Sequence, residues 1–78
     1  MTNQIIEILK EIIEDADGVS WETVNFIEEE LLDSIKMVEL VDHLESVFAV
    51  KISPMDLETK NFESILAIEQ LIKKNKAM

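Results

Sequence analysis

The sequence contains no cysteine, and its 78 residues include only one glycine and one proline. Without cysteine there is no disulfide, so packing alone must hold together the single small domain expected over residues 1–78. Any thiol chemistry must therefore use a sulfur supplied from outside the chain. A single glycine also excludes a glycine-rich phosphate-binding loop. The lack of cysteine fits a reducing compartment.

Long apolar runs are missing as well. No stretch approaches the roughly 18–20 apolar residues that a membrane-spanning helix needs. Residues 1–4 lack the basic region with which a signal peptide begins. We therefore expect a cytoplasmic protein with no membrane partner.

Positive charge is scarce. The chain has 17 acidic residues against seven lysines, with no arginine, and a net charge of −10. Nucleic acids and anionic lipid surfaces repel such a domain, so neither is expected as a partner. Basic protein surfaces attract it, and this attraction speeds encounter. Part of the acidic excess also serves solubility.

No catalytic or metal-binding set is evident. The one histidine, His43, has no cysteine and no positioned serine or aspartate to act with, so no nucleophilic triad is predicted. Residues 15–18 suggest a calcium loop, but Ile13 and Val24 would then occupy positions that require carboxylates. Residues 28–30, three glutamates, could bind a divalent cation loosely, but we expect them to be a solvated charge run. We expect His43 at the surface, no metal site and no enzymatic activity.

The apolar residues that are present recur at helical spacing. Long helices are expected over residues 3–16, from Ser34 or Ile35 to 48, and from 64 to 73 or 74. A brief helical turn is expected over residues 54–59, where a serine precedes the one proline. The fold class is therefore all-α, a small four-helix bundle of three long helices and one short one. Residues 75–78 are expected to form a disordered tail.

The same spacing predicts the core. Its expected members are Ile5, Ile6, Leu9, Ile12, Ile13 and Ala16; Met37, Leu40, Val41, Leu44, Val47 and Phe48; and Phe62, Ile65, Ile68, Leu71 and Ile72. Asp17 and Gly18 are expected to end the first helix, with the glycine in the left-handed conformation. The long connection of residues 18–33 must pack its apolar side chains on the helices. We expect Phe26 and Leu31 to be held in the core and Trp21 to be partly buried. The sequence also allows a short helical turn within residues 21–28.

Ser34 stands at a chemically distinctive place. It follows Leu31-Leu32-Asp33, where the connection turns into the second helix. The free N–H groups and the dipole at a helix N-terminus favour a phosphate. A hydroxyl there is suited to carry a phosphodiester-linked group. The simpler interpretation is that Asp33 and Ser34 only cap the helix, as these residue types often do.

The exposed face of the second helix begins beside Ser34. This face carries Ile35, Glu39, Asp42 and Ser46 at helical spacing, with Val38 flanking them. Isolated exposed apolar residues usually carry no function. Beside the candidate attachment serine, Ile35 and Val38 instead suggest a surface that contacts a partner.

These segments resemble the carrier proteins, which include the acyl, peptidyl and D-alanyl carriers. Leu32-Asp33-Ser34-Ile35, then Val38-Glu39-Leu40-Val41 and Leu44-Glu45, are similar to the modification motif and second helix of that family. Ile52-Ser53-Pro54 and Asn61-Phe62-Glu63-Ser64-Ile65 resemble the entries to its last two helices. The resemblance covers nearly the whole chain and includes the acidic charge.

The resemblance implies that Ser34 carries a 4′-phosphopantetheine arm, with Asp33 helping to present the serine. A phosphopantetheinyl transferase would attach the arm from coenzyme A, with Mg²⁺ serving that enzyme. The arm's thiol would hold acyl cargo as a thioester and so supply the missing sulfur. Ile35, Val38, Glu39 and Asp42 would lie on the face read by the basic docking surfaces of partners, namely the transferase, loading ligases and synthases. A monomer is expected.

The sequence also departs from the family pattern. Lys36, Asp42 and His43 differ from the usual fatty-acid carriers, and residues 28–32 lack the glycine that typically comes shortly before the Asp-Ser pair. The cargo stays open between acyl groups of fatty-acid, polyketide or related synthesis and an amino acid, as in D-alanyl or peptidyl carriers. A third hypothesis is an unmodified acidic module that binds a basic partner through Ile35 and Val38.

Overall fold

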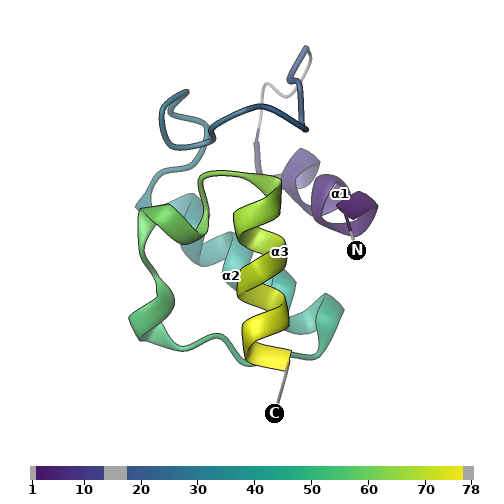
Figure 1. Ribbon diagram of the computed structural model, residues 1–78, viewed down its shortest axis with the longest axis vertical. Coiled ribbons are helices and arrows are strands. Elements are labelled where there is room, and N and C mark those ends of the chain that lie inside the picture. Colours follow the sequence, from purple (N-terminus) through teal and green to yellow (C-terminus); the bar gives the residue numbers. More distant parts are fainter. Residues whose placement is uncertain (1, 14–17, 77–78) are drawn as a thin grey trace.

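The residues that the structure describes form three α-helices and the segments that join them (Figure 1). The structure is a computed structural model that describes residues 2–13 and 18–76. The helices are α1 (Thr2–Ile12), α2 (Ser34–Phe48) and α3 (Ile65–Lys76). Two short 3-10 turns, η1 (Pro54–Asp56) and η2 (Thr59–Asn61), lie between α2 and α3. The all-α class is confirmed, with no strand in the described part of the chain. The short fourth helix of the predicted bundle is not confirmed, because the two 3-10 turns occupy its place.

Helix α1 packs against both α2 and α3. Its buried residues are Ile5, Ile8, Leu9 and Ile12, and Ile13 is buried just beyond it. The prediction was wrong about Ile6, which is only partly buried, and omitted Ile8. A helix that touches two neighbours buries a wider arc than one stripe, and Ile5, Ile8 and Ile12 share that arc at intervals of three and four residues. Residues 14–17, including the predicted core member Ala16, lie outside the described residues.

Helix α2 buries a narrower stripe than its sequence suggested. Met37, Leu40, Leu44 and Phe48 are buried and Val41 is partly buried. Val47 was predicted to be buried but is 49% exposed. Val47 borders an open groove between α1 and α2 that is also lined by Ile8 and His43. It therefore lies at the edge of the stripe, where neither neighbouring helix covers it. His43 is exposed, as predicted.

The connection before α2 is fastened to the core by aromatic residues. Phe26 is fully buried and Trp21 is partly buried beside it, with ring centroids 6.0 Å apart. Leu32 is buried, whereas Leu31, which the sequence suggested for the core, is only partly buried. The expected helical turn is present only as single hydrogen-bonded turns, since no helix is formed between residues 18 and 33. Gly18 has φ +81°, the left-handed conformation expected of it. The prediction was wrong that it ends the first helix, because α1 ends at Ile12 and residue 13 is already outside it.

The segment after α2 alternates between buried and exposed residues. Val50 and Ile52 are buried, while Ala49 and Lys51 are exposed. The Glu45 carboxylate accepts a hydrogen bond from the Ile52 N–H at 2.8 Å, which ties this segment to α2.

Helix α3 completes the core with Ile65, Ile68, Leu71 and Ile72, and Phe62 is fully buried before it. These five residues were all predicted. The disordered tail was predicted wrongly at residues 75 and 76, which belong to α3. Lysines in the last turn favour a longer helix because they lie at the negative end of its dipole. Residues 77 and 78 lie outside the described residues.

Candidate attachment site at the start of helix α2

The backbone of Phe26 holds the start of α2 in place. Its N–H donates to the Glu63 carbonyl at 2.8 Å, and its carbonyl accepts from the N–H groups of Leu31 (2.9 Å) and Leu32 (3.2 Å). With the Phe26 ring fully buried, these bonds join the residues just before α2 to those just before α3. These hydrogen bonds therefore fix the position of the first turn of α2, although the segment that precedes it is not helical.

Glu30 occupies a backbone conformation that favours glycine. Its φ is +57°, and its N–H donates to the Ile27 carbonyl at 3.1 Å. Together with the bond from Leu31 to Phe26, this is the hydrogen-bond pattern of a Schellman motif, in which glycine usually takes the left-handed position. The sequence identified residues 28–30 only as a charge run. The one indication of a tight turn was that the family typically has a glycine shortly before the Asp-Ser pair, which this stretch lacks.

Asp33 is the N-cap of α2. Its backbone is extended, with φ −106° and ψ −175°, and its side chain accepts from the Lys36 N–H at 2.9 Å. The Asp33 carbonyl accepts from the Met37 N–H, also at 2.9 Å. The capping interpretation is therefore confirmed for Asp33, which satisfies one of the free N–H groups of the first turn.

Ser34 is the first helical residue, and its side chain is exposed. Two other serines that precede helical segments use their hydroxyl oxygens as caps: Ser53 accepts from the Met55 N–H at 3.2 Å, and Ser64 from the Ala67 N–H at 3.1 Å. The Ser34 hydroxyl makes no such bond to any residue that the structure describes. Capping by the preceding aspartate thus leaves this hydroxyl available to a reagent.

The predicted partner residues lie along one exposed side of α2. Ile35 is 72% exposed and Val38 is 56% exposed, and both Glu39 and Asp42 are exposed. The structure therefore brings two apolar and two acidic side chains together on the helix that Ser34 begins. Their function as a contact surface stays a prediction.

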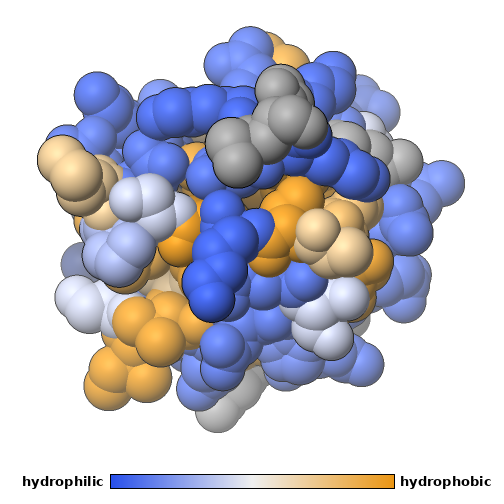
Figure 2. Space-filling model, turned by 90° about the horizontal axis from the view of Figure 1, so that it is seen from below, coloured by the Kyte–Doolittle hydropathy of each residue, from blue (hydrophilic) through white to orange (hydrophobic). Residues whose placement is uncertain are grey.

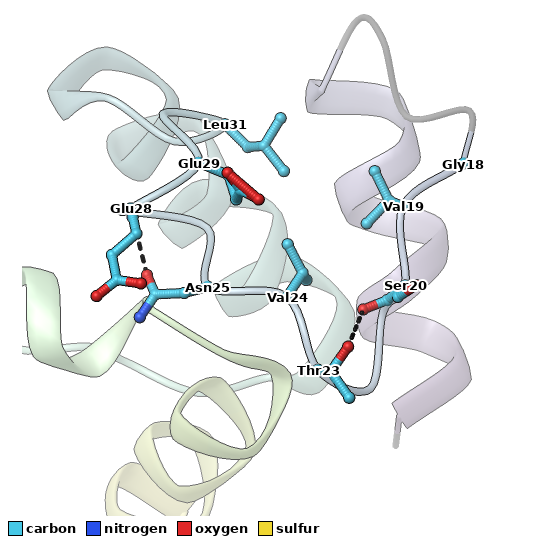
Figure 3. Close-up of a pocket in the computed structure, with 9 residues that line it drawn as sticks. All are labelled: Gly18, Val19, Ser20, Thr23, Val24, Asn25, Glu28, Glu29 and Leu31. Carbon is cyan, nitrogen blue, oxygen red and sulfur yellow. Dashed lines mark hydrogen bonds between the residues drawn. The ribbon is translucent and has the colours of Figure 1, made fainter.

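An open hollow of about 650 Å³ lies in the connection before α2 (Figure 3). Its described lining comes from residues 18–31, including Thr23, Val24 and Asn25. The Asn25 side chain accepts from the N–H groups of Ile27 (3.0 Å) and Glu28 (2.9 Å), and the Thr23 hydroxyl donates to the Ser20 carbonyl at 3.5 Å. These polar groups thus shape the turns of the connection. Asp33 and Ser34 are not among the described residues that line it.

The chain matches the protein family described as "Phosphopantetheine attachment site" over residues 3–72. The protein belongs to this family. It is a phosphopantetheine carrier protein, and the covalent group of the family is 4′-phosphopantetheine. No individual curated protein and no solved structure matches the chain. Carriers of this kind interact with modifying enzymes and synthases in general. None of the described helices is long and apolar enough to cross a membrane.

The residues at the start of α2 fit a phosphate carried on Ser34. Within the described structure, neither the Ser34 N–H nor the Ile35 N–H has an acceptor, because the Asp33 cap engages the next two N–H groups. Free N–H groups at the positive end of a helix dipole stabilise an anion. An exposed hydroxyl beside two free donors is therefore chemically suited to this prosthetic group.

Proposed function

We propose that the protein is a non-catalytic acyl carrier whose 4′-phosphopantetheine is attached to the Ser34 hydroxyl. The observation that supports Ser34 most directly is its free, exposed hydroxyl on the first residue of α2, next to a cap supplied by Asp33. Among the described residues, two other serines are exposed. Ser46 lies within a helix, where the N–H groups are already bonded along the helix, and Ser20 lies in the connection, where no helix begins.

In the proposed modification, the Ser34 oxygen attacks the phosphorus of the coenzyme A diphosphate nearest the pantetheine arm. The serine proton passes to a base of the transferase, a phosphodiester forms at Ser34, and the adenosine bisphosphate leaves. The carrier supplies only the nucleophile and its orientation, so no base of its own is required. The N–H groups of Ser34 and Ile35 are positioned to stabilise the phosphate negative charge.

When bound, the prosthetic group supplies a terminal thiol that holds acyl cargo as a thioester. The chain has no cysteine to compete for the cargo. A flexible arm anchored at a fixed helix start presents the cargo to several enzymes at a high effective concentration.

The exposed side of α2 is the proposed docking surface for these enzymes. Glu39 and Asp42 would attract basic rims around their active sites, and Ile35 and Val38 would contribute apolar contact at the centre. The net charge of −10 supports basic partners. A monomeric protein that acts in the cytoplasm is consistent with this function and forms part of the proposal.

The decisive test is modification with a phosphopantetheinyl transferase, coenzyme A and Mg²⁺, followed by intact mass. The wild type should gain one phosphopantetheinyl group. Ser34→Ala should fold normally and gain none, whereas the control Ser46→Ala, which removes an exposed serine from the same helix, should be modified like the wild type. The assignment would be refuted if Ser34→Ala were modified. It would also be refuted if several transferases failed to modify the wild type and both variants.

The cargo is tested separately on the modified protein. Loading with acyl ligases and acyl-adenylate donors is expected to succeed, and loading by amino-acid ligases alone would identify an aminoacyl carrier instead. If the biological activity survives Ser34→Ala intact, the protein is an unmodified interaction module.

A further inference from the structure

Charge is distributed unevenly along the chain. Residues 1–50 hold thirteen acidic residues and two lysines, whereas residues 51–78 hold four acidic residues and five lysines. The fold turns this difference along the sequence into a difference between the two ends of the molecule. It does so because α2 and α3 begin near the same end and finish near the other (Figure 1).

The end that carries Ser34 is acidic. Residues 28–30 and Asp33 precede α2 and are exposed. Glu63, also exposed, joins them because its carbonyl accepts from the Phe26 N–H at 2.8 Å. A basic partner surface therefore meets several carboxylates around the proposed attachment serine.

The opposite end carries lysines, and we call Lys51, Lys73, Lys74 and Lys76 the lysine end. Three of them lie in the last turn of α3. Lys51 comes three residues after α2, and it lines one hollow together with Lys74 and the 86% exposed Met55. Figure 2 views the molecule from the side on which α3 finishes, and hydrophilic residues cover much of that side. At 1.5 Å per residue, the fifteen residues of α2 alone separate the two ends by roughly 20 Å.

A purely local explanation covers only part of this cluster. Lysines in the last turn of a helix stabilise its dipole, which accounts for the three in α3. Lys74 also binds the Asp56 carboxylate at 2.9 Å. Lys51 lies outside every helix and has no acidic partner within the described residues. Its position beside the end of α3 is therefore not explained by helix stability.

We propose that the lysine end prevents basic partner enzymes from docking at the wrong end of the carrier, so that they bind the acidic end at Ser34. This inference rests on the proposed function, in which the partners are basic. A domain that was acidic on every side would offer such enzymes several docking sites, of which one is productive. Like charges in contact disfavour the wrong complexes, which is how charged surfaces provide specificity.

The separation of the ends lets the lysines act without weakening the productive contact. The Debye length is about 8 Å at physiological ionic strength, well below the roughly 20 Å between the ends. The lysines therefore repel a basic surface that touches them and have little influence on one bound at Ser34. The lysines therefore disfavour the wrong complex only when a partner surface touches them.

The test measures the steady-state kinetics of phosphopantetheinylation of the full chain by a basic transferase at low ionic strength. The main variant is Lys51→Glu/Lys73→Glu/Lys76→Glu, which keeps Lys74 because of its bond to Asp56. Non-productive docking lowers kcat and KM together, and a wrong complex as stable as the right one would halve both, a change of about twofold. At roughly 1 M salt, where the Debye length is about 3 Å, the difference from the wild type should disappear.

Two single variants provide the matched control. Lys51→Glu and Lys10→Glu change the net charge equally, but Lys10 lies on α1. Lys51→Glu should lower kcat, and Lys10→Glu should leave it at the wild-type value. Since Lys51 lies outside the helices, Lys51→Glu keeps the test decisive if the triple variant does not fold.

A second readout uses the amide NMR spectrum of each protein with an inactive transferase. The amides of residues 51–53 and 73–76 should respond in the triple variant and not in the wild type. An unchanged kcat in both Lys51→Glu and the triple variant, or a wild-type response at the lysine end, would overturn the inference. Lack of modification of the wild type at Ser34 is a different result, because it would overturn the proposed function instead.

Discussion

Replacing Glu30 by glycine is expected to stabilise the protein, although it removes an entire side chain. Glu30 has φ +57° and sits at the left-handed position of a Schellman motif. This conformation costs an ordinary L-residue roughly 1–2 kcal/mol. Glycine avoids that strain but loses about 0.5–1 kcal/mol more conformational entropy on folding. The net gain for Glu30→Gly is therefore about 0.5–1 kcal/mol in the free energy of unfolding.

The assay is urea and thermal unfolding followed by circular dichroism. For a domain of this size, the gain corresponds to a rise in Tm of about 2–8 °C. Glu29→Gly is the matched control, because it removes the same side chain from the neighbouring exposed position, where φ is negative. It should lower stability by roughly 0.5–1 kcal/mol. Ala49→Gly gives an independent check, since Ala49 ends α2 with φ +54° and should also be stabilised by glycine.

The expected signs of the effects make the result decisive. A loss of stability in Glu30→Gly as large as that in Glu29→Gly would contradict the prediction, because the left-handed strain at residue 30 would then be absent. A gain in both glutamate variants would point instead to relief of repulsion among residues 28–30. Only opposite signs support the backbone explanation.

Two further predictions concern carboxylates at helix ends. Asp33→Ala removes the cap on the Lys36 N–H and should cost about 1 kcal/mol of stability in urea unfolding. Asp33→Asn keeps a good cap and should be nearly neutral. An equal loss of stability in both variants would contradict the capping function. A slower phosphopantetheinylation of a stable Asp33→Asn would show that the charge itself is used by the transferase. The bond from Lys74 holds the pKa of Asp56 below its ordinary value of 3.8, so the stability that this pair contributes is present above pH 3.8 and is lost as the pH falls further. The difference in Tm between wild type and Asp56→Asn should accordingly shrink towards pH 2, and a difference that persists there would exclude the ion pair as its cause.

The helices and most of the core were predictable because helical spacing directly determines which residues share a face. Four of the six residues predicted to be buried in α2 are buried, and every one predicted at α3 is. The errors lie at the edges of the faces. Ile8 and Val47 differ from the prediction because burial there depends on where neighbouring helices lie, and the spacing within one helix does not contain that information.

The connection before α2 was the least predictable part, for a related reason. Its conformation depends on backbone hydrogen bonds between distant residues, such as that from Phe26 to Glu63, and on the left-handed conformation of Glu30. Neither is a property of side-chain pattern. A glutamate has a low preference for φ above zero, so the residue type at position 30 gave no indication of its conformation.

Asp33 caps the helix and Ser34 is the proposed attachment residue, so each of the two interpretations of this pair applies to one residue. A shift of the helix start by one residue would remove the site. If α2 began one residue later, Ser34 would become the cap, and its oxygen would accept a backbone N–H as those of Ser53 and Ser64 do. The structure instead places the cap on Asp33, which bonds the Lys36 N–H through its carboxylate. Ser34 then keeps a free hydroxyl at the point where the first N–H groups of the helix are still unbonded. The aspartate that precedes the serine thus contributes to the proposed chemistry by occupying the capping position, a contribution that does not require it to touch the reacting atoms.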